Sequence, residues 1–216
     1  SYSRTKGALN FFTTTGSNPY NDKLKFERQL NQNGYSRVAG VDEAGRGALA
    51  GPVVAACVVL PIGLELSGLT DSKKISASSR DLLHDQIHNS GASVGIGQAS
   101  VAEIEGLNIL RATMLAMQRA VLATTPSPDY VLIDGNQLPE IPLPMRSLVK
   151  GDTRCHSISA ASIIAKVSRD RLMLELDKQF PEYGFGQHKG YGTQRHRESI
   201  SSYGPSVCHR KSFRLN

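Results

Sequence analysis

The stretch VAGVDEAGRG, residues 38–47, sets two carboxylates side by side, Asp42 and Glu43. These two charges repel each other, so a folded core that contains both needs a positive group nearby. A divalent cation such as Mg²⁺ would satisfy that need, because hard cations prefer carboxylate oxygens. The Gly-Arg-Gly at 45–47 offers close backbone groups and a phosphate-binding guanidinium. The stretch therefore indicates phosphoryl-transfer chemistry.

Around this stretch, strand and helix patterns alternate from residue 35 onward. Short apolar runs predict strands at 37–41, 53–60, 93–99, 130–133 and 146–149. Helical spacing and capping residues predict helices that begin at Ser76 or Ser78 and end before Gly91, and that cover about 101–123 and 156–180. The alternation predicts an α/β core.

The 216 residues are expected to form one catalytic domain, 37–216, preceded by a polar extension, 1–36. The extension carries one short predicted helix, 24–33, capped by Asn21 or Asp22 and stopped by Gly34. No apolar run approaches 18 residues and no leader pattern is present, so we expect no membrane contact. The cysteines show no paired spacing, which suits a cytoplasmic protein without disulfides or zinc.

The net charge of +6 and the pI near 9.3 are compatible with a polyanionic partner. Residues 188–216 hold six lysines and arginines but a single acid, Glu198. Two interpretations stay open for this segment. It is either a solvated tail or an electrostatic footprint for nucleic-acid phosphates.

Four acids occupy similar places, each at the end of a predicted strand or in the turn beyond it. They are Asp42, Glu43, Asp134 and Asp152. Sites in α/β sheets collect where strands end, so these acids can converge on one metal cluster. Any one of them alone would be read as an ordinary turn or capping carboxylate. The four together predict a metal site.

Strand geometry limits how Asp42 and Glu43 can share a metal, because neighbours in a strand point to opposite faces. Either the chain turns at Glu43, as the glycines that follow permit, or Glu43 also contributes its backbone oxygen. Asp42 is therefore the stronger candidate for a direct ligand.

Five blocks of the chain, in order, resemble ribonuclease HII. They are GVDEAGRGALAGPVVAACVVL (40–60), DSKK (71–74), LIDGN (132–136), KGD with SAASIIAKVSRD (150–152 and 159–170), and YGFGQHKGYGT (183–193). The resemblance runs from about residue 38 to 213, roughly four-fifths of the chain. It implies a ribonuclease H-like fold, with a central mixed β-sheet flanked by helices and a helical C-terminal segment.

The resemblance also implies roles for individual residues. Asp42, Glu43, Asp134 and Asp152 fall on the four catalytic, metal-binding acids of the family. Gly45, Arg46 and Gly47 match the segment that reads the ribose 2′-hydroxyl and its adjacent phosphate. Tyr191 matches the tyrosine that packs on the sugar next to the cut, and Ser72, Lys73 and Lys74 match a substrate-contacting loop.

The activity that the resemblance implies is endonucleolytic cleavage of RNA in RNA–DNA hybrids and on the 5′ side of single ribonucleotides in duplex DNA. Two Mg²⁺ or Mn²⁺ ions about 3.5–4 Å apart suit such a hydrolysis, which leaves a 3′-hydroxyl and a 5′-phosphate. We expect a monomer that acts in ribonucleotide removal and primer removal. The basic C-terminal segment, 207–216, is a candidate contact for a replication clamp.

Two cations on the last predicted long helix, Lys166 and Arg169, are further candidates for nucleic-acid contact. Their spacing of one turn equally suits a solvated helix face. His188 is interpreted as a structural histidine rather than a phosphate or proton contact. Cys155-His156 is rejected as a nucleophilic pair, because no second orienting acid stands at a recognisable spacing.

Three rival interpretations remain. Ribonuclease HIII shares the acid set, but its members resemble a chain with a larger N-terminal domain and without this Gly-Arg-Gly. A junction resolvase or transposase-like nuclease of the same fold would ignore the 2′-hydroxyl. A catalytically silent module would grip hybrids through its basic tail, and the presence of all four acids argues against it.

Overall fold

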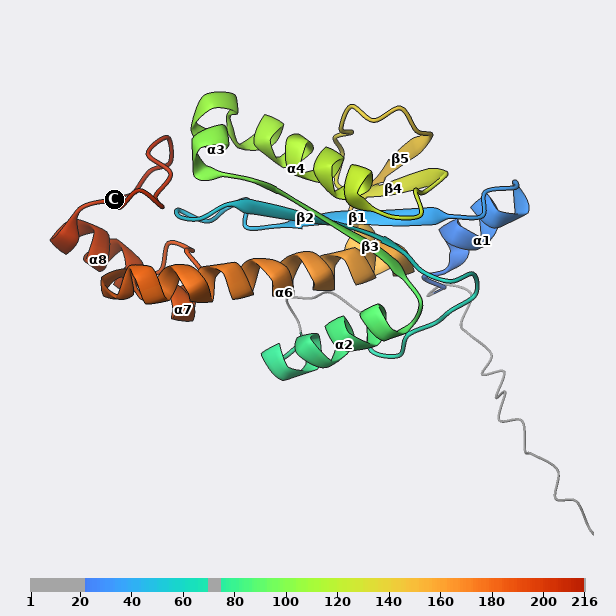
Figure 1. Cartoon of the computed structure of the whole chain (residues 1–216), viewed down its shortest axis with the longest axis horizontal. Coiled ribbons are helices and arrows are strands. Elements are labelled where there is room, and N and C mark those ends of the chain that lie inside the picture. The colour runs from blue at the N-terminus through green and yellow to red at the C-terminus, as the bar shows by residue number, and fades with distance from the viewer. Residues whose placement is uncertain (1–21, 70–74, 216) are drawn as a thin grey trace, which may run out of the picture.

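The computed structural model describes residues 22–69 and 75–215, and its centre is a five-stranded sheet, around which the helices lie (Figure 1). The predicted substrate loop with Ser72, Lys73 and Lys74, and the candidate cap Asn21, lie outside these ranges. The strands are β1 (Val38–Ala44), β2 (Val53–Val59), β3 (Ser93–Ala99), β4 (Tyr130–Asp134) and β5 (Met145–Leu148). Their order is β3-β2-β1-β4-β5. β1 pairs antiparallel with β2 and parallel with β4, so the sheet is mixed, as predicted.

Helices cover both faces of the sheet. Their bounds are α1 (Lys25–Gln32), α2 (Ala77–Asn89), α3 (Val101–Leu107), α4 (Ile109–Ala123), α5 (Gly151–Arg154), α6 (His156–Gln179), α7 (Phe185–His188) and α8 (Gln194–Tyr203). α4 packs on β1, β2 and β3, whereas α6 packs on the opposite face with α2 beside it. α7 and α8 lie at the end of the molecule opposite to α1 (Figure 1). No helix in the described part of the chain is long and apolar enough to cross a membrane.

The predicted strand over 37–41 is too short, because β1 continues through Asp42 and Glu43 to Ala44. The continuation pairs with β2, and Glu43 lies opposite Ala55 in the register. β2 is buried along its whole length, which explains its unbroken apolar sequence. The chain therefore does not turn at Glu43, and one of the two alternatives for that residue is excluded.

The single helix predicted over 101–123 is wrong, because the structure breaks it at Asn108. Asn108 has φ +72° and ends α3, and its side-chain oxygen accepts the backbone N–H groups of Leu110 and Arg111 at the start of α4. With ψ 164°, this is a backbone conformation that residues other than glycine rarely adopt, and the two side-chain hydrogen bonds offset part of its cost. The spacing of the apolar residues continues across Asn108, so the sequence pattern could not reveal the break.

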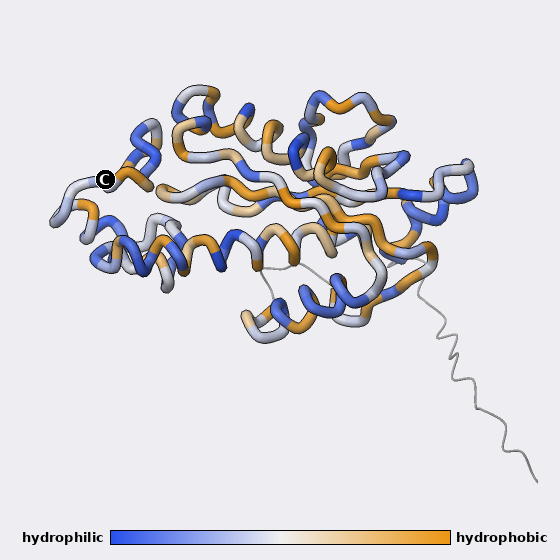
Figure 2. The backbone as a smooth tube through the Cα atoms, viewed as in Figure 1, coloured by the Kyte–Doolittle hydropathy of each residue, from blue (hydrophilic) through white to orange (hydrophobic). Residues whose placement is uncertain are grey.

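The apolar core divides into two layers, one on each face of the sheet. Figure 2 shows hydrophobic residues along the central strands and hydrophilic ones over much of the outer helices. Ala39 and Val41 face α4, whereas Gly40 and Ala44 face α6. This alternation along β1 places Asp42 on the α6 side.

Gly40 allows the close approach of α6 to β1. A Cβ there would lie 2.1 Å from the Ser157 carbonyl carbon and 2.2 Å from the Ile158 nitrogen, and backbone atoms cannot move aside. We expect Gly40→Ala to lower the free energy of unfolding by about 3 kcal/mol, and the melting temperature by roughly 6–12 °C. Gly106→Ala is the control, because open space surrounds Gly106 in α3. That helical substitution should stabilise by up to about 1 kcal/mol. Equal melting temperatures for the two variants would contradict the packing argument.

Candidate active site

Asp42 is a buried carboxylate at the point where the sheet opens. β4 pairs with β1 only as far as Val41, opposite Ile133, so the edge of β1 is open from Asp42 onward. Asp42 is only 6% exposed, its Oδ1 accepts the backbone N–H of Glu43 at 2.7 Å, and its side chain is hydrogen-bonded to Ser162 on α6. Asp42 and Glu43 both line one open hollow of about 400 Å³ despite their alternating directions.

Asp134 ends β4, and Asp152 lies on α5, just beyond the end of the next parallel strand, β5. Because Val41 lies beside Ile133 in the register, Asp134 follows at the level of Asp42. Asp134 Oδ1 accepts the N–H of Gly151 at 2.6 Å, which joins the end of β4 to α5, the short helix that carries Asp152. Carboxylates from β1, β4 and α5 therefore lie along the same edge of the sheet.

Burial and mutual repulsion make the carboxylates of Asp42 and Asp134 unusually basic. Burial, followed by the charges of Glu43 and Asp134, raises the pKa of Asp42 well above its ordinary value. Burial and the charge of Asp152 raise the pKa of Asp134. Among the described residues, no lysine or arginine forms an ion pair with Asp42, Asp134 or Asp152.

The chemistry of this donor set fits a divalent cation. Buried carboxylates without a paired cation are costly unless something positive arrives, and oxygen-only ligands suit Mg²⁺ or Mn²⁺. Within the described ranges, however, no three acidic, histidine or cysteine side chains are gathered tightly enough to form a ready-made metal site.

The Gly-Arg-Gly segment forms one wall of the hollow. Gly45 has φ +92°, and a Cβ there would lie 1.8 Å from Arg169 Nε. A Cβ on Gly47 would meet nothing within 4 Å. Arg46 is half exposed, with its Nη1 3.5 Å from Glu43 Oε1. The first glycine is thus required by the fold, whereas the second leaves room in the hollow.

Two buried arginines support this segment from beneath. Arg169 donates to the carbonyls of Pro52, Ala50 and Lys189 at 2.9–3.0 Å. Arg210 donates to the carbonyls of Gly51 and Arg46 at 2.8–3.0 Å. Both side chains are fully buried.

These contacts correct two sequence interpretations. Neither a nucleic-acid contact nor a solvated helix face fits Arg169, because its guanidinium is out of reach of any ligand. The basic segment 188–216 is not simply a solvated tail, since Arg210, His196 and His209 are buried within it. Its exposed cations still include Lys211 and Arg214.

Tyr191 and Lys166 complete the hollow from the far side. The Tyr191 ring lies 5.7 Å from Lys166 Nζ and 5.5 Å from Arg169 Cζ, and 37% of the residue is exposed. Lys166 Nζ donates to Asp170 at 2.7 Å. The structure thus brings together seven of the predicted residues along one hollow: Asp42, Glu43, Gly45, Arg46, Gly47, Lys166 and Tyr191.

Sequence reasoning missed Ser162 and Ser159. Their small size signalled close packing of α6, but Ser162 also bonds Asp42, and Ser159 Oγ donates to the Asp152 carbonyl. Lys23 Nζ in turn donates to Ser159 Oγ at 3.3 Å, so the N-terminal segment helps to brace α5. Cys155 is buried, and burial raises the pKa of its thiol well above the usual range, which agrees with rejecting it as a nucleophile.

A sequence model described as Ribonuclease HII matches residues 39–216. The chain belongs to the ribonuclease HII family. Ribonuclease HII of Syntrophotalea carbinolica is 54% identical over 191 residues, which cover 88% of this chain and 91% of that protein. Family membership makes the chain a ribonuclease H that cleaves the RNA strand of RNA–DNA hybrids.

Solved structures support the ribonuclease H-like fold. The ribonuclease HII in the PCNA:RNase HII complex from Archaeoglobus fulgidus has a TM-score of 0.69 and 27% identity, over 83% of this chain and 96% of that one. Bst-RNase HIII in complex with Mn²⁺ has a TM-score of 0.68 and 19% identity, over 83% and 67%. The fold alone therefore does not separate ribonuclease HII from HIII, whereas the sequence does.

Proposed function

We propose that this ribonuclease HII cuts on the 5′ side of single ribonucleotides in duplex DNA, as well as within hybrids, and leaves a 3′-hydroxyl and a 5′-phosphate. The observation that carries the proposal is the glycine-lined wall beside Asp42, with an aromatic ring across the same hollow. A ribose between them would meet backbone groups on one side and Tyr191 on the other.

The glycine wall suits recognition of a 2′-hydroxyl. That hydroxyl both donates and accepts hydrogen bonds, and it is what distinguishes RNA from DNA at a given site. Gly47 is exposed and offers its backbone N–H and C=O groups without a side chain in the way, whereas Gly45 is buried and its carbonyl accepts the Ala48 N–H at 3.2 Å. The aromatic face of Tyr191 would pack on a sugar that lacks the hydroxyl, which selects for an RNA-to-DNA junction.

Asp42, Glu43, Asp134 and Asp152 would hold the catalytic cations, which we propose are two Mg²⁺ or Mn²⁺ ions. Such ions offset the negative charge that develops on the phosphodiester. The protein contributes orientation: Ser162 and the Glu43 N–H fix Asp42, and the Gly151 N–H fixes Asp134. Arg46, half exposed at the rim, can reach a phosphate of the bound strand.

The decisive assay uses a DNA duplex with one internal ribonucleotide, in Mg²⁺ and in Mn²⁺, beside an all-DNA duplex. We expect a single cut on the 5′ side of the ribonucleotide, none in the all-DNA duplex, and none in EDTA. Cleavage of long hybrids without that cut would support a ribonuclease HIII-like specificity. Cleavage of the all-DNA duplex would support a junction resolvase, and no metal-dependent cleavage at all would support a silent binding module.

Arg46→Ala is expected to weaken cleavage most at isolated ribonucleotides, because a long hybrid offers further contacts that compensate. A lost charged hydrogen bond costs about 1.5–3 kcal/mol, so kcat/KM at the single ribonucleotide should fall roughly 10–100-fold. Steady-state kinetics on the two substrates measures the difference. An equal loss on both would remove Arg46 from the recognition of isolated ribonucleotides.

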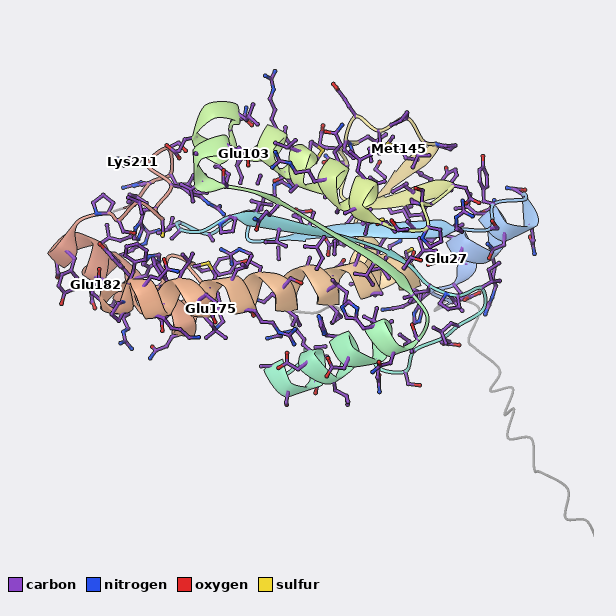
Figure 3. All side chains as sticks on the ribbon, viewed as in Figure 1. Glu27, Glu103, Met145, Glu175, Glu182 and Lys211 are labelled. Carbon is purple, nitrogen blue, oxygen red and sulfur yellow. The ribbon has the colours of Figure 1, made fainter. Side chains whose placement is uncertain are left out.

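We also propose contact with a replication clamp through residues 207–216, which the PCNA:RNase HII complex from Archaeoglobus fulgidus supports. Phe213 and Leu215 pack against the apolar core of this chain, so they are not free to enter a clamp pocket. The contact would instead involve exposed side chains of that segment, such as Val207, Lys211 and Arg214. Lys211 lies at the end of the molecule opposite to Glu27 (Figure 3).

A further inference from the structure

Three histidines lie behind Tyr191, and the proposed function uses none of them. His196 and His209 are fully buried, and His188 is partly buried. The rings of His188 and His196 are stacked with centroids 4.2 Å apart. The cluster joins α7, α8 and the C-terminal segment directly beneath the residue that faces the hollow.

The hydrogen bonds assign one neutral tautomer to His209 and one to His196. The Ser206 backbone N–H donates to His209 Nδ1 at 2.9 Å, so that nitrogen is bare and the proton is on Nε2. His209 Nε2 lies 3.0 Å from His196 Nε2, which must therefore accept. The remaining proton of His196 is on Nδ1, and it points at the Tyr191 carbonyl at 2.9 Å.

The hydrogen bonds of His188 assign its tautomer in the same way. Gly190 N–H donates to its Nδ1 at 3.2 Å, and its Nε2–H donates to the Tyr183 carbonyl at 2.8 Å. Burial lowers the pKa of all three imidazoles, that of His196 to about 4, so they are neutral at neutral pH. Protonation of His196 or His209 would set two donors against each other at the central contact.

We propose that His209 and His196 are positioning residues: a proton-ordered chain, Ser206 to His209 to His196, holds the Tyr191 backbone and thereby sets the ring against the substrate sugar. The Tyr191 carbonyl also accepts the Thr193 N–H at 2.8 Å. The hydrogen bond from His196 therefore fixes the direction of this carbonyl and is not its sole partner. The C-terminal segment is also bridged to the loop that follows β1 through Ala50 and His209. This inference rests on the proposed role of Tyr191.

The kinetic test compares His209→Gln with His209→Leu. The Gln amide can donate to His196 from the place of Nε2, whereas Leu cannot donate. With a single-ribonucleotide duplex, we expect His209→Leu to raise KM about tenfold with kcat changed less than about twofold, as loss of one hydrogen bond suggests. His209→Gln should remain within about twofold of the parent enzyme. A tenfold rise in both variants, or in neither, would overturn the proposal.

Tyr191→Ala separates failure of this inference from failure of the proposed function. If Tyr191→Ala raises KM and His209→Leu does not, the histidine chain does not position the ring. If Tyr191→Ala itself leaves KM unchanged, Tyr191 does not contact the substrate sugar as proposed. The positioning role of the histidines is then contradicted as well.

A second measurement needs no variant and no activity. Two-bond ¹H–¹⁵N spectra of the unaltered protein at neutral pH should show His196 protonated on Nδ1 and both His188 and His209 protonated on Nε2. Finding His196 protonated on Nε2, or charged, would overturn the proposal even if the variants failed to fold.

Discussion

Asp42→Asn is expected to lower the rate of cleavage at least about 10³-fold, which corresponds to about 4 kcal/mol of activation free energy. The amide keeps the shape of the buried side chain but loses the charge that would hold a cation. Binding of the hybrid should largely survive, because the Gly-Arg-Gly segment at 45–47 and Tyr191 are unchanged. Single-turnover cleavage and a binding titration on the same hybrid measure the two effects.

The same substitution should raise the melting temperature in EDTA. A carboxyl whose pKa is raised by folding destabilises the protein at any pH above its ordinary pKa, because the unfolded chain releases its proton first. This loss of folding stability is absent at low pH, grows as the pH rises, and levels off above the pKa that Asp42 has in the folded protein. Asparagine removes it, so Asp42→Asn and the parent should differ at pH 7 and converge in acid.

Glu175→Gln is the matched control, since Glu175 is an exposed acid on α6 that pairs with Lys178 (Figure 3). It should change neither activity nor the effect of added Mg²⁺ on the melting temperature. Turnover by Asp42→Asn within tenfold of the parent would remove Asp42 from the metal site. A lower melting temperature for that variant in EDTA would show that the carboxylate stabilises the fold.

Gly45→Ala is expected to disturb the fold of the loop after β1, whereas Gly47→Ala is expected to disturb only the binding of substrate. At Gly45, φ +92° and the 1.8 Å approach to Arg169 mean that a methyl group must displace the loop or its supporting arginine. We expect kcat/KM to fall about 100-fold and the free energy of unfolding to fall by about 1–3 kcal/mol. Steady-state kinetics and thermal melting measure both losses.

At Gly47 the added methyl group would stand in open space, where it meets only substrate. Gly47→Ala should therefore melt with the parent, raise KM on ribonucleotide-containing duplexes, and leave the affinity for all-DNA duplex unchanged. A drop in melting temperature at Gly47 alone, with Gly45→Ala unaffected, would reverse the assignment of the two glycines.

Much of this fold follows from local sequence patterns. The period of the apolar residues predicts the alternation of strands and helices, and the acids lie near or just beyond the carboxyl ends of β1, β4 and β5. The extension of β1 through Asp42 and Glu43 was not predictable, because two adjacent acids are unfavourable in a strand until its neighbours are known. Only the pairing with β2 keeps them there.

The supporting residues of the site escaped prediction for a different reason. Arg169 and Arg210 resemble surface cations in sequence, and their burial depends on carbonyl groups 117 and 159 positions away. Ser162 is one of several small residues on α6, and nothing local distinguishes it from its neighbours. Contacts of this kind are set by tertiary structure alone.

The anchoring of the Gly45–Pro52 loop by Arg210 has a consequence for the order of events during synthesis. The loop is made early, yet the guanidinium that binds its carbonyls is made 159 residues later. On the ribosome, the sheet edge with its acids can form well before that arginine emerges. We expect the nascent chain to form the carboxylate-bearing sheet edge first and to anchor the Gly45–Pro52 loop last.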